Sequence, residues 1–113
     1  MDEQPIAVKW EEWECQLILS GDIQGQLASV LHQQARQLAG SAKQPVINWE
    51  RATHLDTSAW QVLLALRAEF ERRGVELENR GVGTELRLAM EAAGFTELFP
   101  DPNRGNGISW GLF

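Results

Sequence analysis

The segment spanning residues 46–70 constrains the fold most, because it predicts a buried strand that leads through a short loop into a helix. The strand is indicated by Val46, Ile47 and Trp49, a nearly continuous apolar run that is typical of a strand covered on both faces. After the loop, apolar side chains recur at the three- and four-residue spacing of an amphipathic helix, whose predicted buried face is Val62, Leu63, Leu66 and Phe70. A strand that feeds a helix in this way indicates a helix-covered sheet.

The rest of the chain continues the alternation of strands and helices. Residues 6–20 predict an N-terminal hairpin of two strands, and residues 75–79 alternate as a half-exposed strand does. Helices are expected over residues 26–39, from residue 57 or 58 to 73, and over residues 85–93. The predicted order is β-β-α-β-α-β-α, an α/β fold with a mixed, mostly parallel sheet covered by helices. We expect one domain over residues 1–99 and an extended C-terminal tail over residues 100–113.

Charge and hydropathy narrow the range of partners. The net charge is −6, with 16 acidic against 10 basic side chains, which argues against binding to nucleic acid or to an anionic membrane surface. No apolar run approaches the roughly 18 residues of a membrane span, and the acidic N-terminus does not resemble a secretory signal. These features predict a bacterial-type cytoplasmic protein without direct membrane insertion.

Reactive side chains are few, and their spacing suggests neither a metal site nor a catalytic site. Cys15 is the only cysteine and continues an alternating apolar pattern, so we expect a buried strand thiol. His32 and His54 are far apart in sequence, and we expect no metal and no cofactor. His54, Asp56 and Ser58 are close in sequence but lack the strand–turn–helix elbow of a hydrolase, so no catalytic residues are expected.

The start of the second helix is the candidate functional site. Asp56, Thr57 and Ser58 place small polar side chains where backbone N–H groups are free. Such a site can cap the helix, bind an anion or present a hydroxyl for phosphorylation. Thr57 or Ser58 is expected to cap the helix, and Asp56 is a further cap candidate. Trp60 either packs on Trp49 or on the C-terminal tail, or it anchors a partner.

Three motifs, in this order along residues 8–99, give the chain a family likeness. They are Ser20-Gly21-Asp22-Ile23, Leu55-Asp56-Thr57-Ser58-Ala59, and the run from Arg73-Gly74-Val75-Glu76-Leu77 to Ala93-Gly94-Phe95-Thr96-Glu97-Leu98-Phe99. With these motifs the chain resembles a STAS domain, the fold of the anti-sigma factor antagonists. In the phosphorylatable members the loop pattern is Asp-Ser-Ser-Gly, and its second serine is phosphorylated by a serine kinase that is also the anti-sigma factor. The resemblance places that hydroxyl at Ser58.

The loop departs from the family pattern at three positions. Ala59 replaces the glycine, and Trp60 stands where a smaller aliphatic residue is usual. Gln24 stands where the family has an acidic residue, on a loop that the fold would place beside the serine loop. The loss of that carboxylate changes the electrostatics that a kinase would meet.

The resemblance implies a non-enzymatic regulatory domain that binds a protein partner, an anti-sigma factor or serine kinase, and is switched by phosphorylation of Ser58. The expected partner-binding residues are Gln24, Asp56, Thr57, Ser58, Trp60 and Gln61. One alternative is a constitutive STAS accessory subunit of a phospholipid-transport ABC system or of a chemotaxis-type signalling complex. Another is a small module that binds an anion or nucleotide at the helix start.

Overall fold

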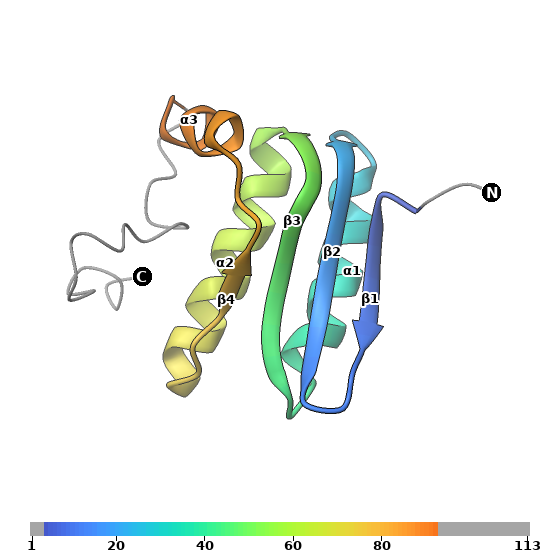
Figure 1. The fold of residues 1–113 in the computed structure, drawn as a ribbon, viewed down its shortest axis with the longest axis vertical. Coiled ribbons are helices and arrows are strands. Elements are labelled where there is room, and N and C mark those ends of the chain that lie inside the picture. The colour runs from blue at the N-terminus through green and yellow to red at the C-terminus, as the bar shows by residue number, and fades with distance from the viewer. Residues whose placement is uncertain (1–3, 93–113) are drawn as a thin grey trace.

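A computed structural model describes residues 4–92 of the chain, as a single sheet with helices packed on it (Figure 1). The strands are β1 (Ile6–Trp10), β2 (Glu14–Ile23), β3 (Gln44–Leu55) and β4 (Glu78–Arg80). The helices are α1 (Leu27–Ala39), α2 (Thr57–Arg73) and α3 (Thr84–Ala92). This order confirms the predicted β-β-α-β-α-β-α sequence of elements. The tail predicted over residues 100–113 lies outside the described residues.

The sheet has the spatial order β1-β2-β3-β4 and is mixed, as predicted. β1 runs antiparallel to β2, and the Glu11 N–H donates to the Glu14 carbonyl (2.9 Å) to close the hairpin. β3 runs parallel to β2, and β4 runs parallel to β3. Parallel neighbours end at the same edge of a sheet, so the residues that follow β2 and β3 are brought together.

Helices α1 and α2 lie behind the sheet in Figure 1, and α3 lies beyond the upper ends of the strands. The core forms where the apolar faces of α1 and α2 meet one face of the sheet, because alternate strand residues point to that face. Its members include Leu17, Leu19, Ile47 and Trp49 from the strands and Leu31, Leu38, Leu63, Leu66 and Phe70 from the helices. Cys15 is fully buried beside them, as predicted, and burial raises the pKa of its thiol.

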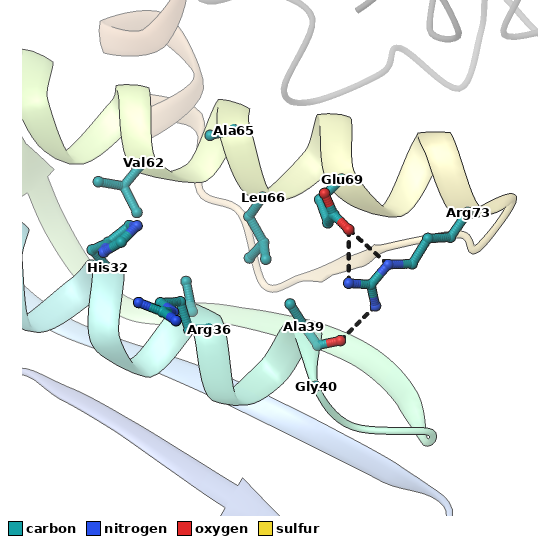
Figure 2. A pocket seen from close by; sticks show the side chains of 10 residues that line it. His32, Arg36, Ala39, Gly40, Val62, Ala65, Leu66, Glu69 and Arg73 are labelled. Carbon is teal, nitrogen blue, oxygen red and sulfur yellow. Dashed lines mark hydrogen bonds and ion pairs between the residues drawn. The ribbon is translucent and has the colours of Figure 1, made fainter.

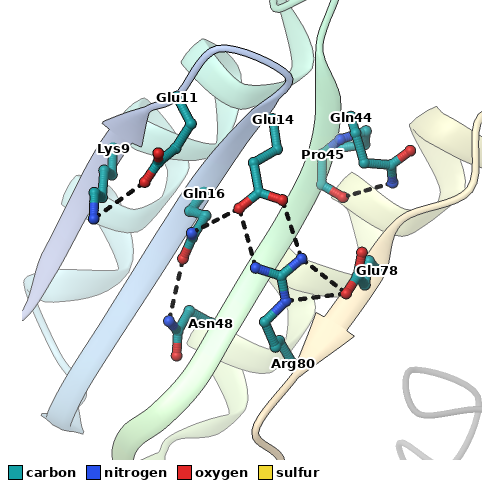
Figure 3. Close-up of polar contacts among 9 residues, drawn as sticks. All are labelled: Lys9, Glu11, Glu14, Gln16, Gln44, Pro45, Asn48, Glu78 and Arg80. Carbon is teal, nitrogen blue, oxygen red and sulfur yellow. Dashed lines mark hydrogen bonds and ion pairs between the residues drawn. The ribbon is translucent and has the colours of Figure 1, made fainter.

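The opposite face of the sheet carries a polar network (Figure 3). The Arg80 guanidinium on β4 reaches across β3 and donates to both carboxylate oxygens of Glu14 on β2, at 3.0 and 3.1 Å. This bond holds the pKa of Glu14 below its usual range. Val46 on β3 is fully buried between Gln16 and Glu78, its partners in register. The burial of Val46 was expected. On this face of the described structure, however, its neighbours are polar side chains and not a helix.

The strands extend further than the sequence suggested. β2 was expected to end near Ser20 and β3 near Trp49, but they continue to Ile23 and Leu55 and stay paired with each other. Beyond Trp49 the strand is mostly polar and exposed, and backbone pairing holds it without an apolar pattern. The register shifts along this part of β2 absorb the irregularity. β4 lies at Glu78–Arg80, later than the predicted residues 75–79.

Candidate functional site

The candidate site lies where β2 leads into α1 and β3 leads into α2, at the upper edge of the sheet in Figure 1. The Asp56 N–H donates to the Ile23 carbonyl at 3.1 Å, so the two strand ends are joined directly. The segment between β2 and α1 contains Gln24 and Gly25, and Asp56 alone separates β3 from α2. The site is therefore built from two short junctions that are 31 residues apart in sequence.

The Asp56 carboxylate organises both junctions. Its Oδ1 accepts the Ala59 N–H at 3.0 Å and the Ser58 hydroxyl at 2.7 Å. Its Oδ2 accepts the Gly25 N–H of the other junction at 2.9 Å. These three donors, with Gly25 the strongest, hold the pKa of Asp56 below its usual range because they favour the ionised form. Asp56 is therefore a carboxylate whose two oxygens are both engaged.

The structure assigns the helix cap to Asp56, and the prediction of a Thr57 or Ser58 cap is wrong. Asp56 has extended backbone geometry (φ −80°, ψ 176°), while α2 already begins at Thr57. Its side chain accepts the Ala59 N–H, which is the defining bond of an N-cap. Thr57 and Ser58 are exposed residues in the first turn of the helix, and the Ser58 hydroxyl donates to the capping carboxylate of Asp56.

Gln24 lies beside this site, as the fold predicted. Its Nε2 donates to Asp22 Oδ2 at 2.7 Å, and Asp22 Oδ1 lies 2.9 Å from His54 Nδ1 on β3. All three side chains are exposed. They form a second link across the same two strand ends, next to the contact between Gly25 and Asp56. The amide of Gln24 adds no charge, so Asp22 and Asp56 are the carboxylates of this edge.

Trp60 and Gln61 differ in their exposure to solvent. Trp60 is only 2% exposed and stacks on Trp49, with ring centroids 5.7 Å apart and planes inclined by 24°. This is the packing alternative that the sequence left open, and burial keeps the indole away from any partner. Gln61 is exposed and remains available for contact.

The residues whose closeness at the candidate site was not foreseen from the sequence are Gly25, Asp22 and His54. Their spatial closeness depends on the parallel pairing of β2 with β3, which puts Asp22 opposite His54 and Ile23 opposite Leu55. A signal was present, because a β-α-β order predicts that both strand ends meet at one edge of the sheet. The length of the strands, and hence the residues that meet, was not evident from the pattern.

Two further findings concern the chemistry open to the chain. Among residues 4–92, no group of three or more His, Cys, Asp or Glu side chains could hold a metal ion. Within that same part of the chain, no helix is both long and apolar enough to span a membrane.

Comparison with solved structures shows which fold this is. The anti-sigma factor antagonist SpoIIAA in its unphosphorylated form matches with a TM-score of 0.62 at 13% identity, over 76% of this chain and 81% of that one. A STAS-domain antisigma-factor antagonist from Rhodobacter sphaeroides matches with a TM-score of 0.51 at 18% identity, over 72% of this chain and 92% of that one. The crystal structure of Mglu matches at 0.59 and 19% identity over 71% of this chain, which corresponds to only 20% of Mglu.

Sequence comparison gives the family. None of the curated protein sequences matches the chain. The family described as "Mlab, STAS domain" matches residues 6–100, which includes every helix and strand described above. The predicted resemblance is thus confirmed, and the chain belongs to the Mlab, STAS domain family, with a fold similar to that of anti-sigma factor antagonists.

Proposed function

We propose that this STAS domain is a non-enzymatic regulator that binds a protein partner at the start of α2, and that phosphorylation of Ser58 switches the binding. The observation that carries the proposal is the Ser58 hydroxyl, which is exposed and donates to the Asp56 carboxylate at 2.7 Å. A kinase can reach such a hydroxyl. A phosphate attached to it would interact electrostatically with the neighbouring carboxylate. Gln24, Thr57 and Gln61 complete the exposed surface around it.

Phosphorylation would alter the site through charge. A phosphoserine adds close to two negative charges near neutral pH and can no longer donate through the hydroxyl. At Ser58 this charge would stand against Asp56, which is ionised and bound to Gly25 and Ala59. Repulsion would act on both junctions at once, while the stack of Trp60 on Trp49 lies below in the core. The partner would meet a changed surface on an unchanged fold.

Two of the solved structures that resemble the chain are anti-sigma factor antagonists, which supports an anti-sigma factor as the proposed partner. The family resemblance adds that such a partner is also a serine kinase. Gln24 makes this edge less acidic than the family pattern. A Gln24→Glu change tests whether the partner prefers the neutral form.

The first test is phosphopeptide mass spectrometry of the protein from its native host, before and after phosphatase treatment. A phosphate on Ser58 supports the switch. The second test compares partner binding by Ser58→Asp with binding by Ser29→Asp, which adds the same charge to an exposed serine in the first turn of α1. We expect Ser58→Asp alone to lose the partner while both variants keep the fold. Equal affinity of Ser58→Asp and wild type would rule out the switch.

A second candidate function rests on the family match over residues 6–100 to the Mlab, STAS domain family. In this alternative the chain is a constitutive accessory subunit, such as that of a phospholipid-transport ABC system, and the same surface holds a permanent partner. Ser58→Ala would then leave the complex intact, while Gln61→Ala would weaken it. Trp60→Ala is not a clean test of contact, because that side chain belongs to the core.

The anion- or nucleotide-binding alternative has less support from the geometry. The start of α2 already holds the Asp56 carboxylate, which accepts the Ala59 N–H that an anion would use. A bound phosphate would also face that carboxylate at close range. A thermal-shift titration with nucleotides tests this alternative, because a ligand of the folded state raises the melting temperature.

A further inference from the structure

A groove runs between α1 and α2, away from the site at Ser58 (Figure 2). Its volume is about 380 Å³, which falls in the range of small-molecule pockets. The side chains that line it include His32, Ala35 and Arg36 from α1 and Val62, Leu66 and Arg73 from α2. Neither helix start contributes to it.

The groove has an apolar floor and one closed end. Ala35 and Leu66 are buried at its base, with Val62 partly buried beside them. At one end Arg73 crosses from α2 and donates to the Ala39 carbonyl of α1 at 2.6 Å. The same guanidinium donates to Glu69 Oε2 at 2.8 Å. Arg73 therefore closes this end of the groove.

The rim of the groove is positively charged, although the chain carries a net charge of −6. Glu69 pairs with both Arg72 and Arg73, so its charge is already offset. Within residues 4–92, no hydrogen bond or ion pair engages the Arg36 guanidinium, which lies over the groove. His32 lies one helical turn before it on the same face of α1. The rim of the groove therefore carries more cationic side chains than carboxylates, and the floor beneath it is apolar.

We propose that this groove binds a small anionic amphiphile, with its carboxylate head on Arg36 and its apolar body along Val62 and Leu66. An arginine presents paired donors that suit a carboxylate, and the apolar floor would shield the hydrocarbon from water. The closed end at Arg73 favours a small molecule over an acidic helix, which would need a groove open at both ends. The site is independent of the proposed switch, because Ser58 lies outside the groove.

The test is an NMR titration of the full chain with octanoate, following backbone amides. Octanol and acetate are the controls, because octanol lacks the charged head and acetate lacks the apolar body. Arg36→Gln removes the free guanidinium, and Arg51→Gln on β3 removes an exposed arginine elsewhere. Loss of a charge-assisted contact in a groove open to water is expected to weaken octanoate binding about tenfold in Arg36→Gln.

The proposal is supported if octanoate shifts the amides that line the groove, if octanol and acetate bind more weakly, and if Arg51→Gln binds like wild type. It is overturned if octanoate leaves these amides unmoved at millimolar concentration, or if Arg36→Gln binds as tightly as wild type. Amide shifts with an acidic helical peptide and none with octanoate would overturn it in favour of a protein ligand.

Discussion

The two central helices begin side by side at the same edge of the sheet, but they begin in different ways. The N-terminal end of α2 is capped by the Asp56 side chain, which accepts the Ala59 N–H. The corresponding residue of α1, Gln26, makes no side-chain cap bond and has helical backbone angles. The junction before α1 is held instead by its Gly25 N–H, which donates to the same Asp56 carboxylate. A single side chain therefore fixes both helix starts.

This asymmetry bears on how the proposed switch would act. Ser58 donates to Asp56, and Asp56 in turn holds Gly25 on the neighbouring junction. A change of charge at Ser58 is thus connected through two hydrogen bonds, by way of Asp56, to Gly25, which lies 31 residues before Asp56 in the chain. The surface that a partner binds would then include the junction before α1 as well as the start of α2.

Among changes at the two helix starts, removal of the Asp56 side chain should lower the free energy of unfolding most. Asp56→Ala loses the cap and leaves Gly25 without its acceptor, so we expect about 2 kcal/mol lower free energy of unfolding. Gln26→Ala, at the uncapped start of α1, should change it by less than about 0.5 kcal/mol. Urea denaturation of both variants measures the difference. Equal losses would show that Asp56 does not organise the edge.

The next largest loss of stability is expected from a change at Gly25, which is the donor in the hydrogen bond to Asp56. Its φ of 61° lies in the left-handed region, so Gly25→Ala should lower the free energy of unfolding by about 1 kcal/mol. Gly40 ends α1 with a φ of −83°, which suits any residue, and an added Cβ there would meet only ordinary contacts. Gly40→Ala is therefore the matched control and should be neutral or slightly stabilising. A similar loss in both variants would contradict the role given to Gly25.

The order of the elements and the position of the serine loop could be predicted, because hydrophobic period and Asp-Thr-Ser are local signals. The direction of Trp60 was also readable in principle. Positions 60, 63, 66 and 70 are apolar and recur at helical spacing, and all four are buried in α2. The prediction instead grouped Val62 with Leu63, Leu66 and Phe70, a phase shifted by part of a turn, and Val62 lies at the margin of the core. A small error of phase was enough to leave the direction of Trp60 undecided.

Contacts that cross between elements could not be predicted in the same way. The bond from Arg80 to Glu14 spans three strands, and its existence depends on the register of β2, β3 and β4 together. The bond from Gly25 to Asp56 depends on where β2 ends, and the sequence placed that end near Ser20. A one-residue error in register moves a side chain to the other face of a sheet, so such bonds are lost from any local argument.

The pH dependence of stability gives a smaller effect, because the Asp56 carboxylate is partly open to water. Its folded pKa is lowered by Gly25, Ala59 and Ser58, so its contribution is fully present above the unfolded pKa of about 3.9. As the pH falls through the lower folded pKa, the contribution is lost. The difference in free energy of unfolding between wild type and Asp56→Asn should thus be constant near neutral pH and shrink below about pH 4. A difference that stays the same down to pH 2 would show that the charge on Asp56 is not what holds the edge.

The smallest change in the free energy of unfolding should come from Ser58→Ala. Its size shows whether the Ser58 hydroxyl is needed for stability or is free to serve as a switch. The Ser58 hydroxyl is exposed, and without it Asp56 still accepts from Gly25 and Ala59. We expect the free energy of unfolding to change by less than about 0.5 kcal/mol, again by urea denaturation. Thr57→Ala, one residue earlier in the same exposed turn, is the control and should behave alike. A loss as large as that of Asp56→Ala would mean that Ser58 is needed to build the site. A small loss leaves the hydroxyl free to be modified without endangering the fold, which is the property that a phosphorylated residue needs.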